Sequence, residues 1–303
     1  MSHWHEIENK EISIDMRTGF FKKMWRLMVI SFNHFNDFNG FKLSAALSYY
    51  TVFSVAPLLI VIISLAGFFF GKLAVEGRVY HQISGLVGSE AALQIQNIIR
   101  NTQESNHGKL GGIIGTIILI IGASGVFSEM QSSINYLWSV PPPKEKAFLV
   151  ALFRKLISFS LLIAVAFLLL VSLLANALLE ILSDRLVRLF SITSLNLFYF
   201  INLGLIILVI SSMFMLIFKI LPNSTISWKN SFIGALATSV LFLAGKFFIG
   251  YYLGHSKIGA TFGAAASIVI LMLWIYYSSI ILYFGACLTS TLSTFRGQPI
   301  RGR

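Results

Sequence analysis

The chain of 303 residues has few charged residues and a single cysteine. Lys, Arg, Asp and Glu make up 12% of it, whereas a soluble globular domain has about 25%. Hydrophobic residues make up 56%, and the mean hydropathy is +0.79. These values predict a membrane protein with several spans. The lone Cys287 excludes a disulfide framework and a thiolate metal cluster.

Residues arranged for catalysis or cofactor binding are also missing. The six histidines are dispersed and have no carboxylate or thiol partners at metal-ligand spacing. The chain has no phosphate-binding glycine loop, Walker lysine or nucleophile elbow. We therefore expect no enzyme, no metal and no cofactor. The formal charge of +11 is spread over loops and termini, which argues against a nucleic-acid partner.

Long apolar runs occur six times, and a bilayer core of ~30 Å needs about 20 apolar residues per helix. The sequence predicts an all-α, polytopic membrane domain over residues 44–293. Its six transmembrane helices are placed near 44–70, 110–138, 156–179, 197–218, 231–254 and 263–293. With this arrangement, 15 of the 23 Lys and Arg residues lie on the side of the N-terminus and 8 on the other. The positive-inside rule then places both termini, residues 1–43 and 294–303, in the cytoplasm.

Two segments outside the spans predict amphipathic helices. Before the first span, apolar residues follow one helical stripe beside Lys22, Lys23 and Arg26: Phe21, Trp25, Met28, Phe32 and Phe35. A basic helix with aromatic anchors is typical of one that lies in the cytoplasmic headgroup layer, and packing on other spans is the alternative. The outer loop over residues 72–109 contains SEAALQIQNIIRNTQ, which predicts a short helix.

The second half of the span at 110–138 is polar for a membrane helix. Helical periodicity puts Glu129 and Ser132 on one face with Gly122 and Gly125. The glycines allow a neighbouring helix to approach, and the polar side chains face that helix or an aqueous cleft. Two interpretations of Glu129 stay open: a substrate or proton role, and a structural hydrogen-bonding role.

The first and fifth spans contain further polar or kinking residues. Pro57 removes a backbone donor and predicts a kink near the bilayer centre, on one face with Tyr50 and Ser54. Lys246 is either a functional residue or one that snorkels to the outer interface. The predicted polar groove therefore comprises Glu129, Tyr50, Ser54, Pro57, Ser132, Asn135 and Lys246. Glycines four residues apart predict close helix crossings, within one chain or between copies in a homo-oligomer.

Several segments carry a family resemblance: ALSYYTVFSVAPLL, SSINYLWSV, LPNSTISWKNSFIGA and FGAAASIVILMLWIYYSSIILYFGACL. In this order, from about residue 20 to 295, they resemble the BrkB/YihY family of bacterial inner-membrane proteins. The resemblance implies a six-span protein linked to envelope integrity and serum resistance. Cys287 stands where family members often have an acidic residue, which puts any role of that carboxylate in doubt. An old family label is tRNA-processing ribonuclease, but such an enzyme needs a metal-ligand cluster that this sequence lacks.

The sequence as a whole predicts a transporter or flippase-like protein of the bacterial inner membrane. The expected cargo is an amphiphilic or envelope-related solute or lipid, which would move along the polar groove. The alternative is a structural or scaffolding membrane protein whose polar groups only close the helix bundle.

Overall fold

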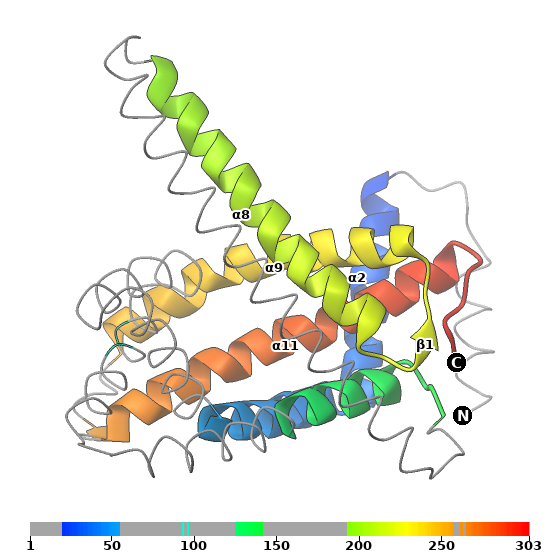
Figure 1. Ribbon diagram of the computed structural model, residues 1–303, viewed down its shortest axis with the longest axis horizontal. Helices are drawn as coiled ribbons and strands as arrows, with labels where there is room; N and C mark the ends of the chain where they lie inside the picture. The colour runs from blue at the N-terminus through cyan, green and yellow to red at the C-terminus, as the bar shows by residue number, and fades with distance from the viewer. Residues whose placement is uncertain are drawn as a thin grey trace, which may run out of the picture. The chain divides into compact units, whose positions relative to one another are not determined.

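The computed structural model describes residues 20–54, 93, 96, 125–141, 193–256, 261–262 and 265–302 (Figure 1). The labelled elements are α2 (Phe20–Asp37), α8 (Thr193–Ile220), β1 (Ser224–Thr225), α9 (Trp228–His255), α11 (Ala266–Phe295) and β2 (Arg301–Gly302). Residues 40–54 and 125–137 are helical as well. The described part of the chain is thus predominantly α-helical, as predicted.

Among the residues that the structure describes, three helices are long and apolar enough to cross a membrane. The qualifying stretches of α8, α9 and α11 are Leu203–Ile220, Trp228–Leu253 and Ile268–Phe295. They confirm three of the predicted spans, at 197–218, 231–254 and 263–293, as apolar helices of spanning length. The predicted spans at 44–70 and 110–138 are helical where they are described. The span at 156–179, residues 1–19 and most of the loop 72–109 lie outside the described residues.

Contacts within the chain define two compact units. Unit one comprises residues 1–38, 134–240 and 284–303. Unit two comprises residues 39–133 and 241–283. Helix α2, helix α8 and both strands belong to unit one, and the helix over residues 40–54 belongs to unit two. Helices α9 and α11 contribute residues to both.

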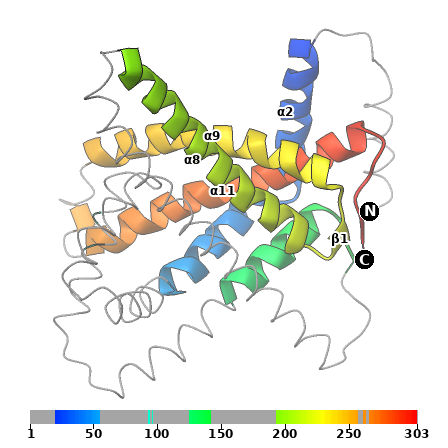
Figure 2. The same cartoon turned by 45° about the horizontal axis from the view of Figure 1, so that its top comes forward.

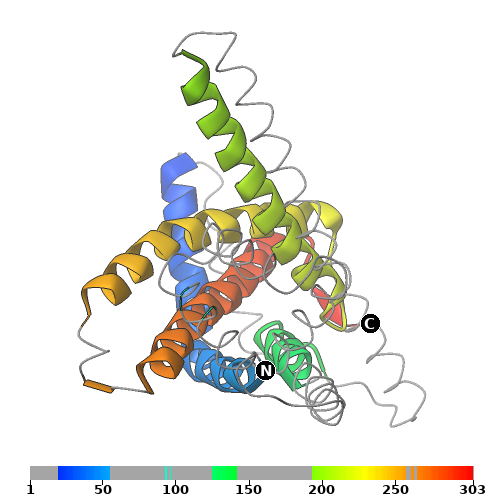
Figure 3. The same ribbon diagram turned by 60° about the vertical axis from the view of Figure 1, so that its left-hand side comes forward.

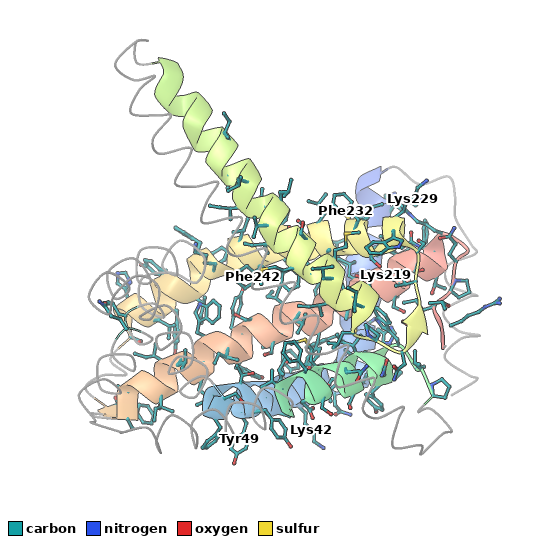
Figure 4. The ribbon with its side chains drawn as sticks, in the orientation of Figure 1. Lys42, Tyr49, Lys219, Lys229, Phe232 and Phe242 are labelled. Atoms are coloured by element: carbon teal, nitrogen blue, oxygen red, sulfur yellow. The ribbon has the colours of Figure 1, made fainter. Side chains whose placement is uncertain are left out.

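The turn between α8 and α9 in unit one follows from local sequence signals. Helix α8 ends at Ile220, just before Pro222. Ser227 caps α9, because its Oγ accepts a hydrogen bond of 3.3 Å from the backbone N–H of Asn230. Lys219, labelled in Figure 4, donates to a backbone carbonyl of the turn, and its Nζ lies 5.3 Å from the ring centroid of Trp228. A lysine in the last turn also interacts favourably with the helix dipole.

The C-terminal residues 296–302 are fastened to this turn. Strand β2 pairs antiparallel with β1, Thr225 opposite Arg301, near the C-terminus in Figure 2. The buried Asn230 amide donates to Ser293 Oγ at 3.0 Å and to Gln298 Oε1 at 3.1 Å. The predicted cytoplasmic tail at 294–303 is therefore, over its described part, attached to the start of α9.

Helices α9 and α11 cross closely in unit one, and two glycines allow this approach. A Cβ added to Gly234 would lie 2.0 Å from Oγ1 of Thr289, and one added to Gly285 would lie 2.2 Å from Oγ1 of Thr238. Each threonine hydroxyl donates 2.7 Å to the glycine carbonyl one turn before it on its own helix. The hydroxyls are therefore satisfied, and each threonine side chain, with its hydroxyl oxygen nearest, fills the space beside the opposite glycine.

Helix α2 is helical as predicted, but only part of its predicted apolar stripe is buried. Phe35 is buried, with its ring centroid 6.3 Å from that of Phe284, and Leu27 is buried as well. In contrast, Trp25 is 73% and Phe32 is 51% exposed. One side of α2 therefore packs against other residues of unit one, and the other side leaves aromatic residues exposed. Its position in the headgroup layer stays a prediction.

The segment after the helix at 125–137 is bound to two other parts of unit one. The helix ends before Pro141, since proline cannot continue a helix, and Ser139 has a positive φ of 52°. The indole N–H of Trp138 donates 2.9 Å to the carbonyl of Ala286 on α11. His34 Nε2 lies 2.8 Å from the carbonyl of Leu137, which is one of the last carbonyls of the helix.

Candidate functional site

The best-defined polar site in unit two is on residues 125–133, which lie beside the helix over residues 40–54 (Figure 3). A Cβ added to Gly125 would be 3.8 Å from the Tyr50 ring, so the two helices are in near contact there. One turn later, the Glu129 carboxylate accepts a hydrogen bond of 3.1 Å from Ser133 Oγ. Gly125, Glu129 and Ser133 thus occupy one helical face at steps of four residues.

Tyr283 of α11 completes this site. Its side chain is 0% exposed, and its hydroxyl lies beside Ser133 and Glu129. The hydroxyl makes no well-formed hydrogen bond within the described residues. Buried hydroxyls nearly always have a partner, and Ser133 is the polar side chain nearest to this one among the described residues that act on it. We call Glu129, Ser133 and Tyr283 the carboxylate cluster.

Residues of the first predicted span lie close to the cluster but make their own contacts. Tyr50 is 46% exposed, and its ring is the group that approaches Gly125. Ser54 is buried and donates 2.9 Å to the carbonyl of Tyr50 on its own helix. Pro57 lies outside the described residues.

Ser132 and Asn135 are placed differently from the predicted groove. Ser132 is exposed, and its neighbour Ser133 is the serine that meets the carboxylate. Asn135 belongs to unit one, where its Oδ1 accepts a hydrogen bond of 2.9 Å from the backbone N–H of Asn223. The structure therefore gives Asn135 a role in holding the α8–α9 turn.

Lys246 lies on α9 in unit two and is partly buried. It follows Gly245, where an added Cβ would lie 1.0 Å from the hydroxyl oxygen of Tyr277 on α11. Tyr277 precedes Tyr283 by six residues, a distance of about 9 Å along the helix axis. Lys246 therefore follows a residue that packs against Tyr277 of α11, whereas the carboxylate cluster contains Tyr283 of the same helix.

Ser133 and Tyr283 were missed in the prediction from sequence. The spacing of four residues from Glu129 was a usable signal for Ser133. Tyr283 is more than 150 positions from Glu129, and no local pattern in α11 distinguishes it from the neighbouring tyrosines. Among the residues that the structure describes, no three His, Cys, Asp or Glu side chains form a group that would hold a metal ion.

Comparison with protein families identifies the relatives of this chain. The family profile described as Virulence factor BrkB matches residues 31–302, from the middle of α2 to β2. The chain belongs to the BrkB family. Cys287, where the resemblance implied an acidic residue, is on α11, and its side chain is 0% exposed. No solved structure matches the chain.

Curated relatives are UPF0761 membrane proteins. One from Stenotrophomonas maltophilia is 29% identical over 276 residues, which is 89% of this chain and 62% of the relative. One from Xanthomonas axonopodis pv. citri is 24% identical over 282 residues, 93% of this chain and 63% of the relative. A third, from Tolumonas auensis, is 35% identical over 91 residues, 29% of this chain and 30% of the relative. This BrkB-family chain thus spans less than two thirds of the first two relatives, and it is a membrane protein like them.

Proposed function

We propose that this BrkB-family protein is a transporter or flippase-like protein of the bacterial inner membrane, and that it is not an enzyme. The supporting observation is the carboxylate cluster, in which Glu129 accepts a hydrogen bond from Ser133 in the neighbourhood of the buried Tyr283. Ionisable residues among membrane helices are costly and usually mark a pathway or relay. The proposed cargo is an amphiphilic, envelope-related solute or lipid.

A transporter in this sense needs a polar site that is next to a helix surface open to lipid. Tyr50 satisfies the second condition, since it is half-exposed and its ring reaches the helix of Glu129. An amphiphilic molecule would contact the tyrosine with its apolar part and the cluster with its polar part. This arrangement supports the proposed class of cargo.

A scaffolding protein is the second candidate, and unit one supports it. The reciprocal packing of Gly234 and Gly285 on threonines, together with the Trp138 hydrogen bond, serves to hold helices together. Exposed aromatic residues on α2, such as Trp25, would anchor that bundle at a lipid surface. In this case the carboxylate cluster would have no effect on flux.

Flux measurement in vesicles separates the two candidates. The purified protein is reconstituted in phosphatidylethanolamine and phosphatidylglycerol vesicles that contain a trace of fluorescent phosphatidylglycerol, and dithionite quenches the dye in the outer leaflet. We expect the wild type to expose dye from the inner leaflet and the double variant Glu129→Gln, Tyr50→Phe to lose this activity.

The matched control is Ser132→Ala, because Ser132 is on the same helix but exposed. It should retain the wild-type flux. Equal flux in the wild type and the double variant, or no flux above that of protein-free vesicles, would contradict lipid transport and favour the scaffold.

A further inference from the structure

We propose that cations at one end of the helices in unit one bind the headgroup of an anionic phospholipid. The residues are Lys22 and Lys23 of α2, Lys229 of α9 and Arg296, which directly follows α11. We call them the basic cluster. Their binding of a headgroup concerns the membrane around the protein, and it does not depend on the proposed transport.

Contacts between the three helices bring these cations to one place. Lys23 Nζ lies 4.3 Å from the ring centroid of Phe295, the last residue of α11, so the start of α2 lies beside the end of α11. The guanidinium of Arg296 donates a hydrogen bond of 3.3 Å to Oδ1 of Asn230, the neighbour of Lys229. The starts of α2 and α9 and the end of α11 therefore meet within unit one.

The basic cluster is also at the level where two apolar helices would leave the hydrocarbon of a membrane. The stretch of α9 that is long and apolar enough to span begins at Trp228, and that of α11 ends at Phe295. Lys229, labelled in Figure 4, follows the first of these limits directly, and Arg296 follows the second. The polar headgroups begin where the hydrocarbon core ends. Cations at this level are therefore placed to meet lipid phosphates.

Positive charge dominates the described surface around the basic cluster. Lys22, Lys229 and Arg296 are exposed, so an anionic group has access to them. In the described part of unit one Asp37 is the single acidic residue, about 21 Å along the axis of α2 from Lys23. This separation exceeds the Debye length of about 8 Å at physiological ionic strength. Charge complementarity therefore favours an anionic partner.

Two exposed tryptophans favour a phospholipid over a soluble acidic partner. Trp25 is on α2 two residues after Lys23, and Trp228 directly precedes Lys229. Indole rings prefer the boundary between hydrocarbon and headgroups, where the ring is in an apolar environment and its N–H can hydrogen-bond. An anionic phospholipid supplies a phosphate for the cations and acyl chains for the rings, whereas a nucleic acid or an acidic peptide supplies no acyl chains.

Tryptophan quenching by brominated lipids tests the proposal. The purified full-length protein is reconstituted in phosphatidylcholine vesicles that contain equal shares of either brominated phosphatidylglycerol or brominated phosphatidylcholine. We expect the anionic lipid to quench the wild type more strongly, with a relative affinity about fivefold higher, which is the effect of one Lys or Arg near an anionic surface. This preference should decrease at high salt, because salt screens exposed charges.

The double variant Lys22→Gln, Lys229→Gln removes charge from the basic cluster and keeps the contacts of Lys23 and Arg296 that join the helices. Its preference for phosphatidylglycerol should be lost. Lys229→Gln alone should lower the preference. The matched control is Lys42→Gln, which removes an exposed lysine of unit two and should retain the wild-type preference.

Quenching is read without any transport, so its result is separate from that of the flux assay. Equal quenching of the wild type by the two brominated lipids overturns the proposal and favours a soluble acidic partner. An equal loss of preference in Lys229→Gln and Lys42→Gln overturns the assignment to the basic cluster. A preference that persists in Trp25→Phe, Trp228→Phe would place the anionic lipid elsewhere on the protein, and its loss in this variant supports the site.

Discussion

At the scale of single residues, Trp138 connects the end of one helix to the middle of another. Its side chain is 4% exposed, and its indole N–H donates to the carbonyl of Ala286. Trp138→Phe keeps most of the buried apolar surface but removes this donor. We expect a loss of about 1 kcal/mol in the free energy of unfolding, measured as a lower thermal midpoint by circular dichroism in detergent.

The control for this variant is Trp25→Phe on α2, because Trp25 is 73% exposed. Its free energy of unfolding should change by no more than is usual for surface substitutions, about ±0.5 kcal/mol. Equal midpoints for Trp138→Phe and the wild type would show that the hydrogen bond to α11 does not contribute to stability.

The polar residues around Glu129 show what the sequence predicts at this scale. At about 100° per residue, Ser132 lies about 60° to one side of Glu129 and Ser133 about 40° to the other. Periodicity alone puts both on the polar face, and only the packing of neighbouring helices decides which is buried. Asn135 lies about 120° away from Glu129 by the same geometry. Its separation from the cluster was therefore predictable.

At the scale of elements, close approach of helices depends on glycines that face a partner. Gly234→Ala would bring a Cβ to 2.0 Å from Oγ1 of Thr289, and a β-branched side chain has little freedom to move. We expect this overpacking to lower the free energy of unfolding by about 1–3 kcal/mol. Thermal unfolding of the purified variant in detergent measures it.

Gly250→Ala is the matched control, since Gly250 is on the same helix and no atom lies within 4 Å of an added Cβ. Alanine in this position should be neutral or stabilise the helix by up to about 1 kcal/mol. The close crossing of α9 and α11 would be disproved if both alanine variants unfolded at the same temperature.

Element boundaries were more predictable than element pairings. Pro222 and Ser227 end and begin helices through their own backbone and side-chain chemistry, so a few neighbouring residues suffice to place the turn. Gly250 and Gly254 are four residues apart, yet Gly250 has open space beside it, whereas Gly234 has no glycine four residues away and lies at a close crossing. That crossing is formed by a glycine and a threonine on different helices, and a pattern within one helix does not contain this information.

At the scale of the whole molecule, composition and hydropathy are enough to establish the class. Low charge and long apolar runs predicted a helical membrane protein, which the three long apolar helices and the family match confirm. Contacts such as the hydrogen bond from Trp138 to Ala286 could not be predicted from the sequence, because they depend on how distant helices are arranged. The predicted number of spans follows from hydropathy, and the predicted orientation follows from the distribution of Lys and Arg. Both stay predictions.

Cysteine labelling tests the predicted orientation, in which six spans place both termini in the cytoplasm. The native Cys287 is buried, so Cys287→Ala provides a background without other thiols. In that background we expect Ser105→Cys, in the predicted outer loop, to react with a membrane-impermeant maleimide in intact spheroplasts. We expect Ser13→Cys and Arg303→Cys to react only after lysis, since the excess of Lys and Arg keeps their side in the cytoplasm. Labelling of one terminus and not the other in intact spheroplasts would require an odd number of spans, and labelling of both would invert the orientation.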